Sequence, residues 1–262
     1  AWEGSGSGGI DYTWDTSSTS GIQSGTGTWG SNSFWTVTGG SGTSLAAWPG
    51  AGNSATFAGG TDRDAGGYHV GISGTQNVDS ITFNNSGFWL EGGTSINFGS
   101  KKGIYVASGK NVCIATPIAG TGGITKTGSG TLFFGTTNTY TGGTTISAGC
   151  ISIGYGTTVG ALSGDVVNND SLIFNRSDIY SYSGNISGTG TVYKYGSGTL
   201  TFTGANTATG LVIGSGTMQI GAGSTSGSFS GWISNGTSVI FNRSDSYTYS
   251  SVIGGAGSVT KS

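Results

Sequence analysis

The chain has 262 residues and a net charge of −2, and 55 glycines, 40 serines and 38 threonines make up about half of it. Charged residues account for only 8 % of the chain, and there are two prolines. The scarcity of helix formers excludes a mainly helical protein, and nothing provides a basic stripe for nucleic acid. No run approaches the ~18 apolar residues that span a bilayer.

The N-terminal region is rich in tryptophan, since five of the seven tryptophans lie at or before position 48. We predict that residues 1–60 form an aromatic cap, because the open end of a stack of strands would otherwise pair with other chains. The alternative is a platform on which sugar rings stack, with Trp29 and Trp35 as the candidate ligand-binding residues. Few carboxylates and amides lie near them, which favours the cap.

The densest polar cluster follows, at Asp62-Arg63-Asp64, with His69 a few residues on. Asp62 and Asp64 are candidate metal ligands, because their carboxylates could hold calcium or act as a general acid/base pair. The alternative is a solvated loop. With a single histidine and no Gly-x-Ser-x-Gly elbow, we expect no catalytic residue, no metal and no cofactor.

Short apolar runs bounded by Gly, Asn or Ser recur further along the chain, at 80–83, 103–106, 131–134 and 199–202. Their β-branched and aromatic residues favour short strands joined by turns over disorder. In the run at 131–134, alternation places Leu132 and Phe134 inward and Phe133 outward. The run at 199–202 repeats this pattern with Thr201 in the outward position.

Cys113 and Cys150 lie 37 positions apart. In an exported protein a disulfide between neighbouring coils is one interpretation, and two small buried thiols is the other.

An internal repeat is the strongest feature of the sequence. Lys126 and Lys194 occupy the same place in two similar segments at an offset of 68, and Lys261 opens a third copy. A second block recurs at an offset of 67, as Asn175-Arg176-Ser177-Asp178 and Asn242-Arg243-Ser244-Asp245. We place the repeats at about 121–188 and 189–257, with a third starting at 258–262.

The period predicts a parallel β-helix over residues 61–262. One repeat divides into roughly three coils of ~22 residues with three strands each, and nine coils give a rod of about 45 Å.

The recurring Asn-Arg-Ser-Asp block has two interpretations. Arg176 and Asp178 lie on one face of an extended chain and could pair, as could Arg243 and Asp245. We favour a coil corner whose Asn175 and Asn242 bond the backbone. The alternative is a repeated ligand contact, with copies three coils, or ~14 Å, apart.

Residues 123–149, which begin Gly123-Ile124-Thr125-Lys126, resemble the autotransporter-associated β-strand repeat of bacterial passenger regions. The second copy, from Lys194 to Gly216, keeps the pattern with one glycine fewer. The resemblance implies a right-handed parallel β-helix that is exported after removal of a signal peptide and displayed on the cell surface, associated with the outer membrane. It brings no catalytic residues, because the repeat is a structural module.

Three functions are consistent with this sequence. We favour a non-catalytic stalk or adhesin segment; the alternatives are a subunit of an extracellular fibre or surface layer, and an exported carbohydrate-binding or carbohydrate-active β-helix. Expected partners are host or neighbouring-cell surface molecules, glycans, or copies of the chain itself. Because the chain starts at Ala1 and stops just inside a repeat, we expect a mature piece of a longer protein. Membrane contact is then expected only through a C-terminal part beyond Ser262.

Overall fold

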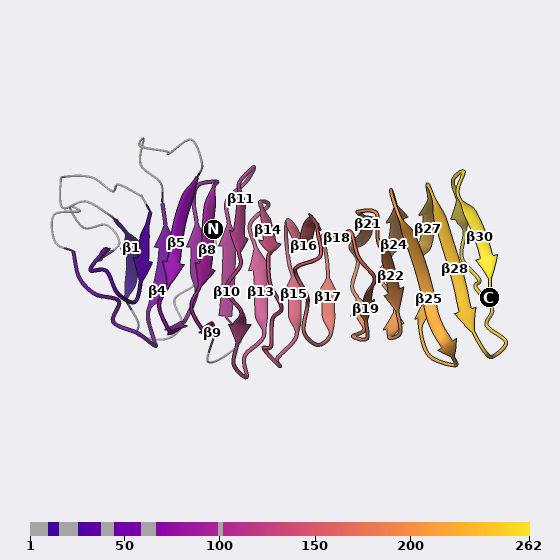
Figure 1. Ribbon diagram of the computed structural model, residues 1–262, viewed down its shortest axis with the longest axis horizontal. Helices are drawn as coiled ribbons and strands as arrows, with labels where there is room; N and C mark the ends of the chain where they lie inside the picture. The colour runs from indigo at the N-terminus through magenta and orange to yellow at the C-terminus, as the bar shows by residue number, and fades with distance from the viewer. Residues whose placement is uncertain (1–9, 16–25, 38–44, 59–66, 99–101) are drawn as a thin grey trace.

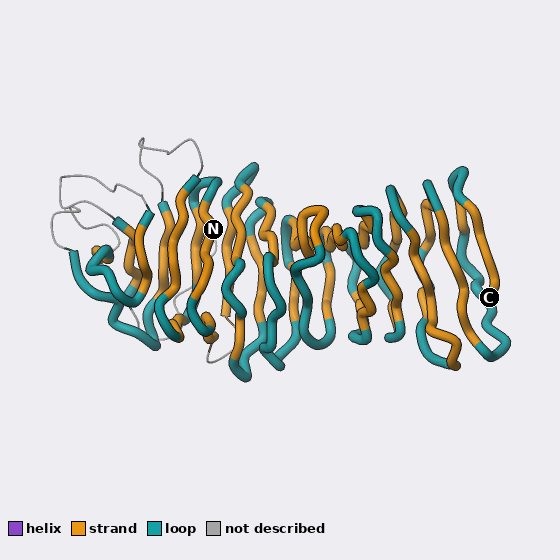
Figure 2. Tube along the Cα trace, viewed as in Figure 1, coloured by secondary structure: helices purple, strands orange, loops and turns teal. Residues whose placement is uncertain are grey.

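The computed structural model describes residues 10–15, 26–37, 45–58, 67–98 and 102–262. Within these ranges, all the regular secondary structure is β-strand. The strands lie side by side across the long axis of an elongated molecule, from β1 (Asp11–Trp14) to β30 (Ser258–Lys261) (Figure 1). Figure 2 shows the short turns that separate them. No described segment forms a helix long and apolar enough to cross a membrane.

The strands of the described residues form four sheets. The first sheet contains β1, β3 (Trp35–Val37), β4 (Ser54–Phe57), β7 (Ile81–Phe83), β10 (Lys102–Val106), β13 (Ile124–Thr127), β15 (Thr144–Ile146), β17 (Val166–Asn168), β20 (Ile186–Ser187), β23 (Ala205–Asn206) and β26 (Ser228–Phe229). The second sheet contains β2 (Gly27–Trp29), β5 (Tyr68–Ile72), β8 (Phe88–Gly92), β11 (Asn111–Ile114), β14 (Thr131–Phe134), β16 (Cys150–Thr157), β18 (Ser171–Arg176), β21 (Thr191–Tyr195), β24 (Gly210–Ile213), β27 (Trp232–Asn235) and β29 (Ile253–Gly254). The third sheet contains β6 (Thr75–Val78), β9 (Ser95–Phe98) and β12 (Ile118–Ala119), and the fourth contains β19 (Tyr180–Tyr182), β22 (Thr199–Phe202), β25 (Thr217–Ser224), β28 (Ser238–Arg243) and β30.

One coil of the chain visits three sides of the rod in turn. In most coils a strand of the first sheet is followed by one of the second, and then by one of the third or fourth sheet, as in β7, β8 and β9 or β17, β18 and β19. The coils that begin with β13 and β15, which the structure describes throughout, carry no strand on that third side. Neighbours within each sheet are parallel, apart from β3, so the other strands pair with their counterparts one coil away. The prediction of a parallel β-helix is confirmed.

The coils are shorter than predicted. Along the second sheet from β11 onward, paired residues are 19 to 22 positions apart, as in Leu132 with Ile151 and Leu211 with Ile233. A coil therefore takes about 20 residues rather than 22, and the strands stack into about ten coils rather than nine.

Equivalent residues of successive copies of the repeat lie on different sides of the rod. Lys126 lies in the first sheet, Lys194 in the second and Lys261 in the fourth. With about 20 residues per coil, one repeat spans about three and one third coils, and one third of a coil is one side. The expected separation of three coils is therefore wrong. Equivalent residues turn by about 120° and advance by ~16 Å along the rod.

One continuous apolar core runs through the coils. The strands predicted at 131–134 and 199–202 coincide with β14 and β22, and Leu132, Phe134, Leu200 and Phe202 are buried as the alternation requires. Outward Phe133 is partly exposed, whereas Thr201 in the equivalent position is only 6 % exposed.

Aromatic rings fill the first described coils. Trp14, Trp29 and Trp35 are fully buried, and their ring centroids lie 5.2 Å from one another in the pairs Trp14–Trp35 and Trp29–Trp35. At this end the first sheet finishes in β3, which is antiparallel to β1. A reversed edge strand and a plug of rings are what closing a stack requires. A boundary of the cap at residue 60 remains a prediction.

Candidate functional site

Lys126 of the repeat points into the interior and is fully buried. Its Nζ donates hydrogen bonds to the carbonyl oxygens of Thr127 (2.9 Å), the last residue of β13, and of Gly128 (2.7 Å), in the turn that follows. A third bond reaches the carbonyl of Ala148 (3.2 Å), in the turn one coil later. One ammonium therefore joins two coils and uses all three of its protons.

Lys194 repeats this arrangement on the second sheet. Its Nζ donates to the carbonyls of Tyr195 (2.9 Å) and Gly196 (2.8 Å) and, one coil later, to that of Ser215 (3.1 Å). The next residue, Gly216, has φ +68°, and a Cβ there would come within 2.7 Å of Nζ. The glycine-rich turn is therefore shaped around the ammonium group.

The three lysines of the repeat differ in burial. Burial disfavours the charged ammonium and lowers the pKa of both Lys126 and Lys194 to about 8, so both stay mainly protonated at neutral pH. Lys261 is exposed, and its Nζ donates to the carbonyl of Arg243 at 2.8 Å.

Buried asparagines add a second tie between coils, which the sequence reasoning missed. The Nδ2 of Asn168 donates to the carbonyl of Thr191 in the next coil (3.0 Å), and its Oδ1 accepts from the backbone N–H of Asp170 (3.3 Å). Asn235, one repeat later, makes the equivalent two bonds at 2.8 and 3.2 Å. The available signal was an asparagine at an inward position of a strand, recurring at the period of the repeat.

A second pair of asparagines is Asn138 and Asn206. Asn138 lies between the third and fourth sheets, where its Oδ1 accepts from the N–H of Ile118 (2.9 Å) and its Nδ2 donates to the carbonyl of Ala161 (2.8 Å). Asn206 makes the equivalent bonds at 3.0 and 3.1 Å. The Asn138 side chain thus supplies the hydrogen bonds between coils that the backbone of a strand would otherwise make at this position.

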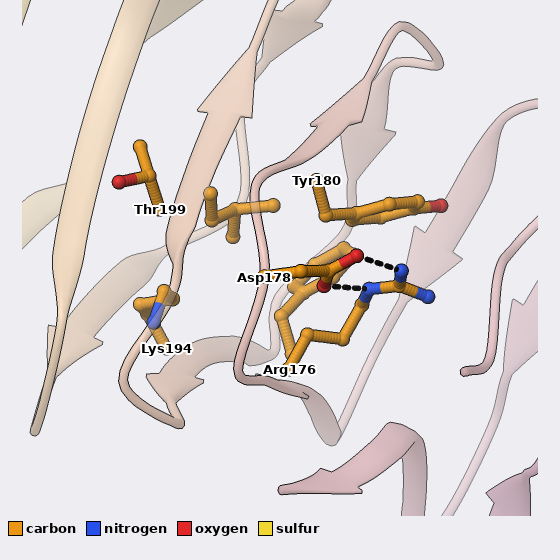
Figure 3. Close-up of a pocket in the computed structure, with 7 residues that line it drawn as sticks. Arg176, Asp178, Tyr180, Lys194 and Thr199 are labelled. Atoms are coloured by element: carbon orange, nitrogen blue, oxygen red, sulfur yellow. Dashed lines mark hydrogen bonds and ion pairs between the residues drawn. The ribbon is translucent and has the colours of Figure 1, made fainter. Parts of the chain in front are cut away.

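Arg176 and Asp178 form the corner between β18 and β19 (Figure 3). The Nε and Nη2 of Arg176 donate to the two carboxylate oxygens of Asp178, at 2.9 and 2.6 Å, which is a bidentate pair. Its Nη1 donates to the carbonyl of Gly160, which belongs to the loop after β16, and the guanidinium lies 4.7 Å from the centre of the Tyr180 ring. The predicted local pairing is confirmed.

Arg243 reproduces this corner in the next copy of the repeat. It pairs with Asp245 at 2.8 and 2.6 Å, donates to the carbonyl of Gly227 and lies 4.6 Å from the centre of the Tyr247 ring. The hydrogen bonds from the arginines lower the pKa of Asp178 and of Asp245.

Lys194 and the first arginine corner line one small cavity (Figure 3). Its volume is about 10 Å³, which a single water molecule would fill. The donors of Arg176 are directed at protein acceptors, so the corner supports a structural role. Among the described residues, no side-chain hydrogen bond is made by Asn175 or Asn242. The expectation that these asparagines bond the backbone is therefore wrong, and the arginines take that role.

The tryptophans proposed as a sugar platform lie out of reach of a ligand. Trp29 and Trp35 are fully buried, and each packs against Phe57, at 5.8 and 5.7 Å between ring centroids. Their prediction as ligand-binding residues is wrong, because their rings close the core.

The two cysteines are free. Cys113 pairs with Phe133 and Phe133 with Ser152, so Cys113 and the β16 strand that carries Cys150 are two coils apart. That spacing is about 9.6 Å, beyond the reach of a disulfide. The disulfide interpretation is therefore replaced by two thiols, of which Cys113 is buried.

Asp62 and Asp64, the candidate metal ligands, lie outside the described residues. Within the described part of the chain, no three His, Cys, Asp or Glu side chains gather in a way that could hold a metal ion.

These contacts define a class of protein: a parallel β-solenoid built on a repeat whose buried polar side chains hold the coils in register. Residues 124–153 and 192–220 match the family model of the passenger-associated-transport repeat. The chain is also 53 % identical over 55 residues to an adhesin autotransporter, BmaC, of Brucella suis biovar 1 (strain 1330). That match covers 21 % of this chain and 2 % of the relative, so the chain spans a small fraction of the relative's length.

The resemblance to autotransporter passenger repeats is confirmed by these two matches. Both indicate an exported protein of the cell surface, associated with the outer membrane. No solved structure matches the chain.

Proposed function

We propose that this chain is a non-catalytic stalk segment of a surface-displayed adhesin. Its relative is named as an adhesin, and the repeats are those of passenger regions. One observation supports the stalk role above others: the recurring polar side chains, two buried lysines, four asparagines and two arginines, bond the protein's own backbone. Their donors and acceptors keep the coils stacked.

A stalk supplies length, so the segment should tolerate loss of one repeat. Excision of residues 194–260 from the full-length protein joins Tyr193 to Lys261 and keeps the repeat sequence continuous. We expect the excised protein to reach the cell surface and still mediate attachment, with the rod shortened by ~16 Å. Attachment assays at matched surface amounts, with electron cryotomography of the same cells, test this.

Two results would contradict the stalk proposal. Loss of attachment at an unchanged surface amount would mean that residues 194–260 contact the partner themselves. An ordered lattice on the cells, rather than separate rods, would favour a subunit of a surface layer.

A further inference from the structure

The outward face of the second sheet carries a row of aromatic rings. His69 pairs with Trp89, Trp89 with Cys113, and Cys113 with Phe133, so these side chains follow one another along the side of the rod. The rings of His69 and Trp89 are stacked, with centroids 6.1 Å apart. Within the described part of the chain, the paired positions of this row hold neither lysine nor arginine.

Tyr155 completes the row from a later coil. It lies in the segment of β16 where the register with β18 shifts, and its ring contacts Trp89 at 5.5 Å and Phe133 at 6.1 Å between centroids. Both contacts are edge-to-face, at 69° and 72°. Such contacts fix the ring orientations before any ligand arrives.

A glycine makes room for this arrangement. A Cβ on Gly135 would lie 3.1 Å from both the Sγ of Cys113 and the hydroxyl of Tyr155. The rings above it cover Cys113, which points outward yet is only 4 % exposed. Trp89, Phe133 and Tyr155 themselves remain partly exposed.

His69 and Glu91 form a polar pair at one end of the aromatic row. The Nδ1 of His69 lies 2.9 Å from Oε1 of Glu91, and these side chains are 46 % and 45 % exposed. Glu91 Oε2 and His69 Nε2 stay outside that bond and can meet the hydroxyl groups of a ligand.

The chemistry of this row selects its occupant. Polyanions such as nucleic acid or sulfated glycans need cations, which the row lacks. A stable protein partner needs a contact of about 800 Å² per side, larger than three partly covered rings offer. Neutral sugars fit both features, because the apolar faces of pyranose rings stack on aromatic rings while their hydroxyls bond a carboxylate or imidazole. Trp89 and Phe133 are two coils apart, ~10 Å, which suits two linked sugar rings.

We propose that Trp89, Phe133 and Tyr155, with His69 and Glu91, form a binding site for a neutral oligosaccharide. The site is independent of the stalk role, because excision of residues 194–260 leaves all five residues in place.

Calorimetric titration of the 262-residue chain with cellotetraose, tetra-N-acetylchitotetraose and maltotetraose tests the site. At least one of the three should bind, and Trp89→Ala should weaken that binding by about tenfold or more. Trp89→Phe, which keeps a ring, should retain most of the affinity. Trp232→Ala is the matched control, because Trp232 is a 39 % exposed tryptophan on β27 of the same sheet. It should bind like the unaltered chain.

Circular dichroism of each variant verifies that the fold is intact. The proposal is overturned if none of the three tetrasaccharides binds at millimolar concentration. It is also overturned if folded Trp89→Ala binds as tightly as the unaltered chain, or if Trp232→Ala loses affinity to the same extent.

Discussion

Lys126 and Lys194 are the least expected residues in the interior, because a buried ammonium destabilises a fold unless its protons are bonded. Here each satisfies three backbone carbonyls that converge from two successive turns. The lysines therefore provide hydrogen-bond donors for carbonyl groups that two successive glycine-rich turns would otherwise leave unpaired between coils.

Replacing Lys126 by methionine keeps the apolar stem and removes the donors. Three buried carbonyls then lose their partner, and we expect the free energy of unfolding to fall by about 3 kcal/mol. Urea denaturation followed by circular dichroism measures the loss. Lys110→Met, at a half-exposed lysine in a turn, is the control and should change stability by less than about 0.5 kcal/mol. Equal effects of the two substitutions would contradict the role given to Lys126.

The arginine corners predict how the rod responds to acid. The pKa of Asp178 and that of Asp245 are lowered in the folded chain, so the unfolded chain binds protons more tightly. Their stabilisation is complete above the ordinary aspartate pKa of 3.8 and is lost as the pH falls through the lower folded pKa.

A double variant, Asp178→Asn with Asp245→Asn, tests this. It should be less stable than the unaltered chain at pH 6, and the difference should shrink as the pH falls below about 4. Denaturation at a series of pH values gives both curves. A difference that is constant from pH 6 to pH 2 would mean that the carboxylates stabilise the corners by another route.

At the scale of the strands, the sequence predicted that the elements are strands, and which of their residues face inward, better than it predicted the length of a coil. The runs at 131–134 and 199–202 were found with their observed bounds because turn residues flank them on both sides. Strands of two residues, such as β12, β20 and β23, carry too little periodicity to be recognised. They are held by their neighbours in the stack and by the asparagines beside them.

The candidate site was only partly predictable. The Arg–Asp pairing followed from spacing within one extended segment, which is local information. The carbonyls that Lys126 and Lys194 bind, and the covering of Trp29 and Trp35, depend on which coil lies next. That depends on the coil length, and a change from ~22 to about 20 residues alters every neighbour.

Coils that contact only their neighbours should be removable one at a time. Leu172 and Val192 are stacked, so deleting residues 172–191 removes one whole coil and joins equivalent positions. We expect this variant to fold, with the far-ultraviolet spectrum of the unaltered chain and a modest loss of stability.

Deleting residues 172–181 removes half a coil and serves as the contrast. It shifts later strands to the wrong side of the rod and should unfold much of the chain. Thermal unfolding by circular dichroism compares the two. If both deletions are tolerated equally, the strands can fold on a different side of the rod from the one they occupy in this structure, which contradicts the expectation.

For the whole molecule, the repeat and the coil have different periods, and this mismatch shapes the rod. Because one repeat spans about three and one third coils, successive copies place the arginine corner on successive sides. Three copies restore the starting side, so a long run of such repeats presents the same surface features all around its axis.

The central claim is that coils stack along one axis with parallel strands in register. Spin-label distances test it most directly, in a chain carrying Cys113→Ser and Cys150→Ser. One label replaces Thr125, and the other replaces Ser187, Thr207 or Ser230, which continue the same outward row of the first sheet. Double electron–electron resonance should give distances that rise by about 5 Å per coil, to ~14, ~19 and ~24 Å for the three pairs. Distances that do not rise in this order would contradict a single stack of coils.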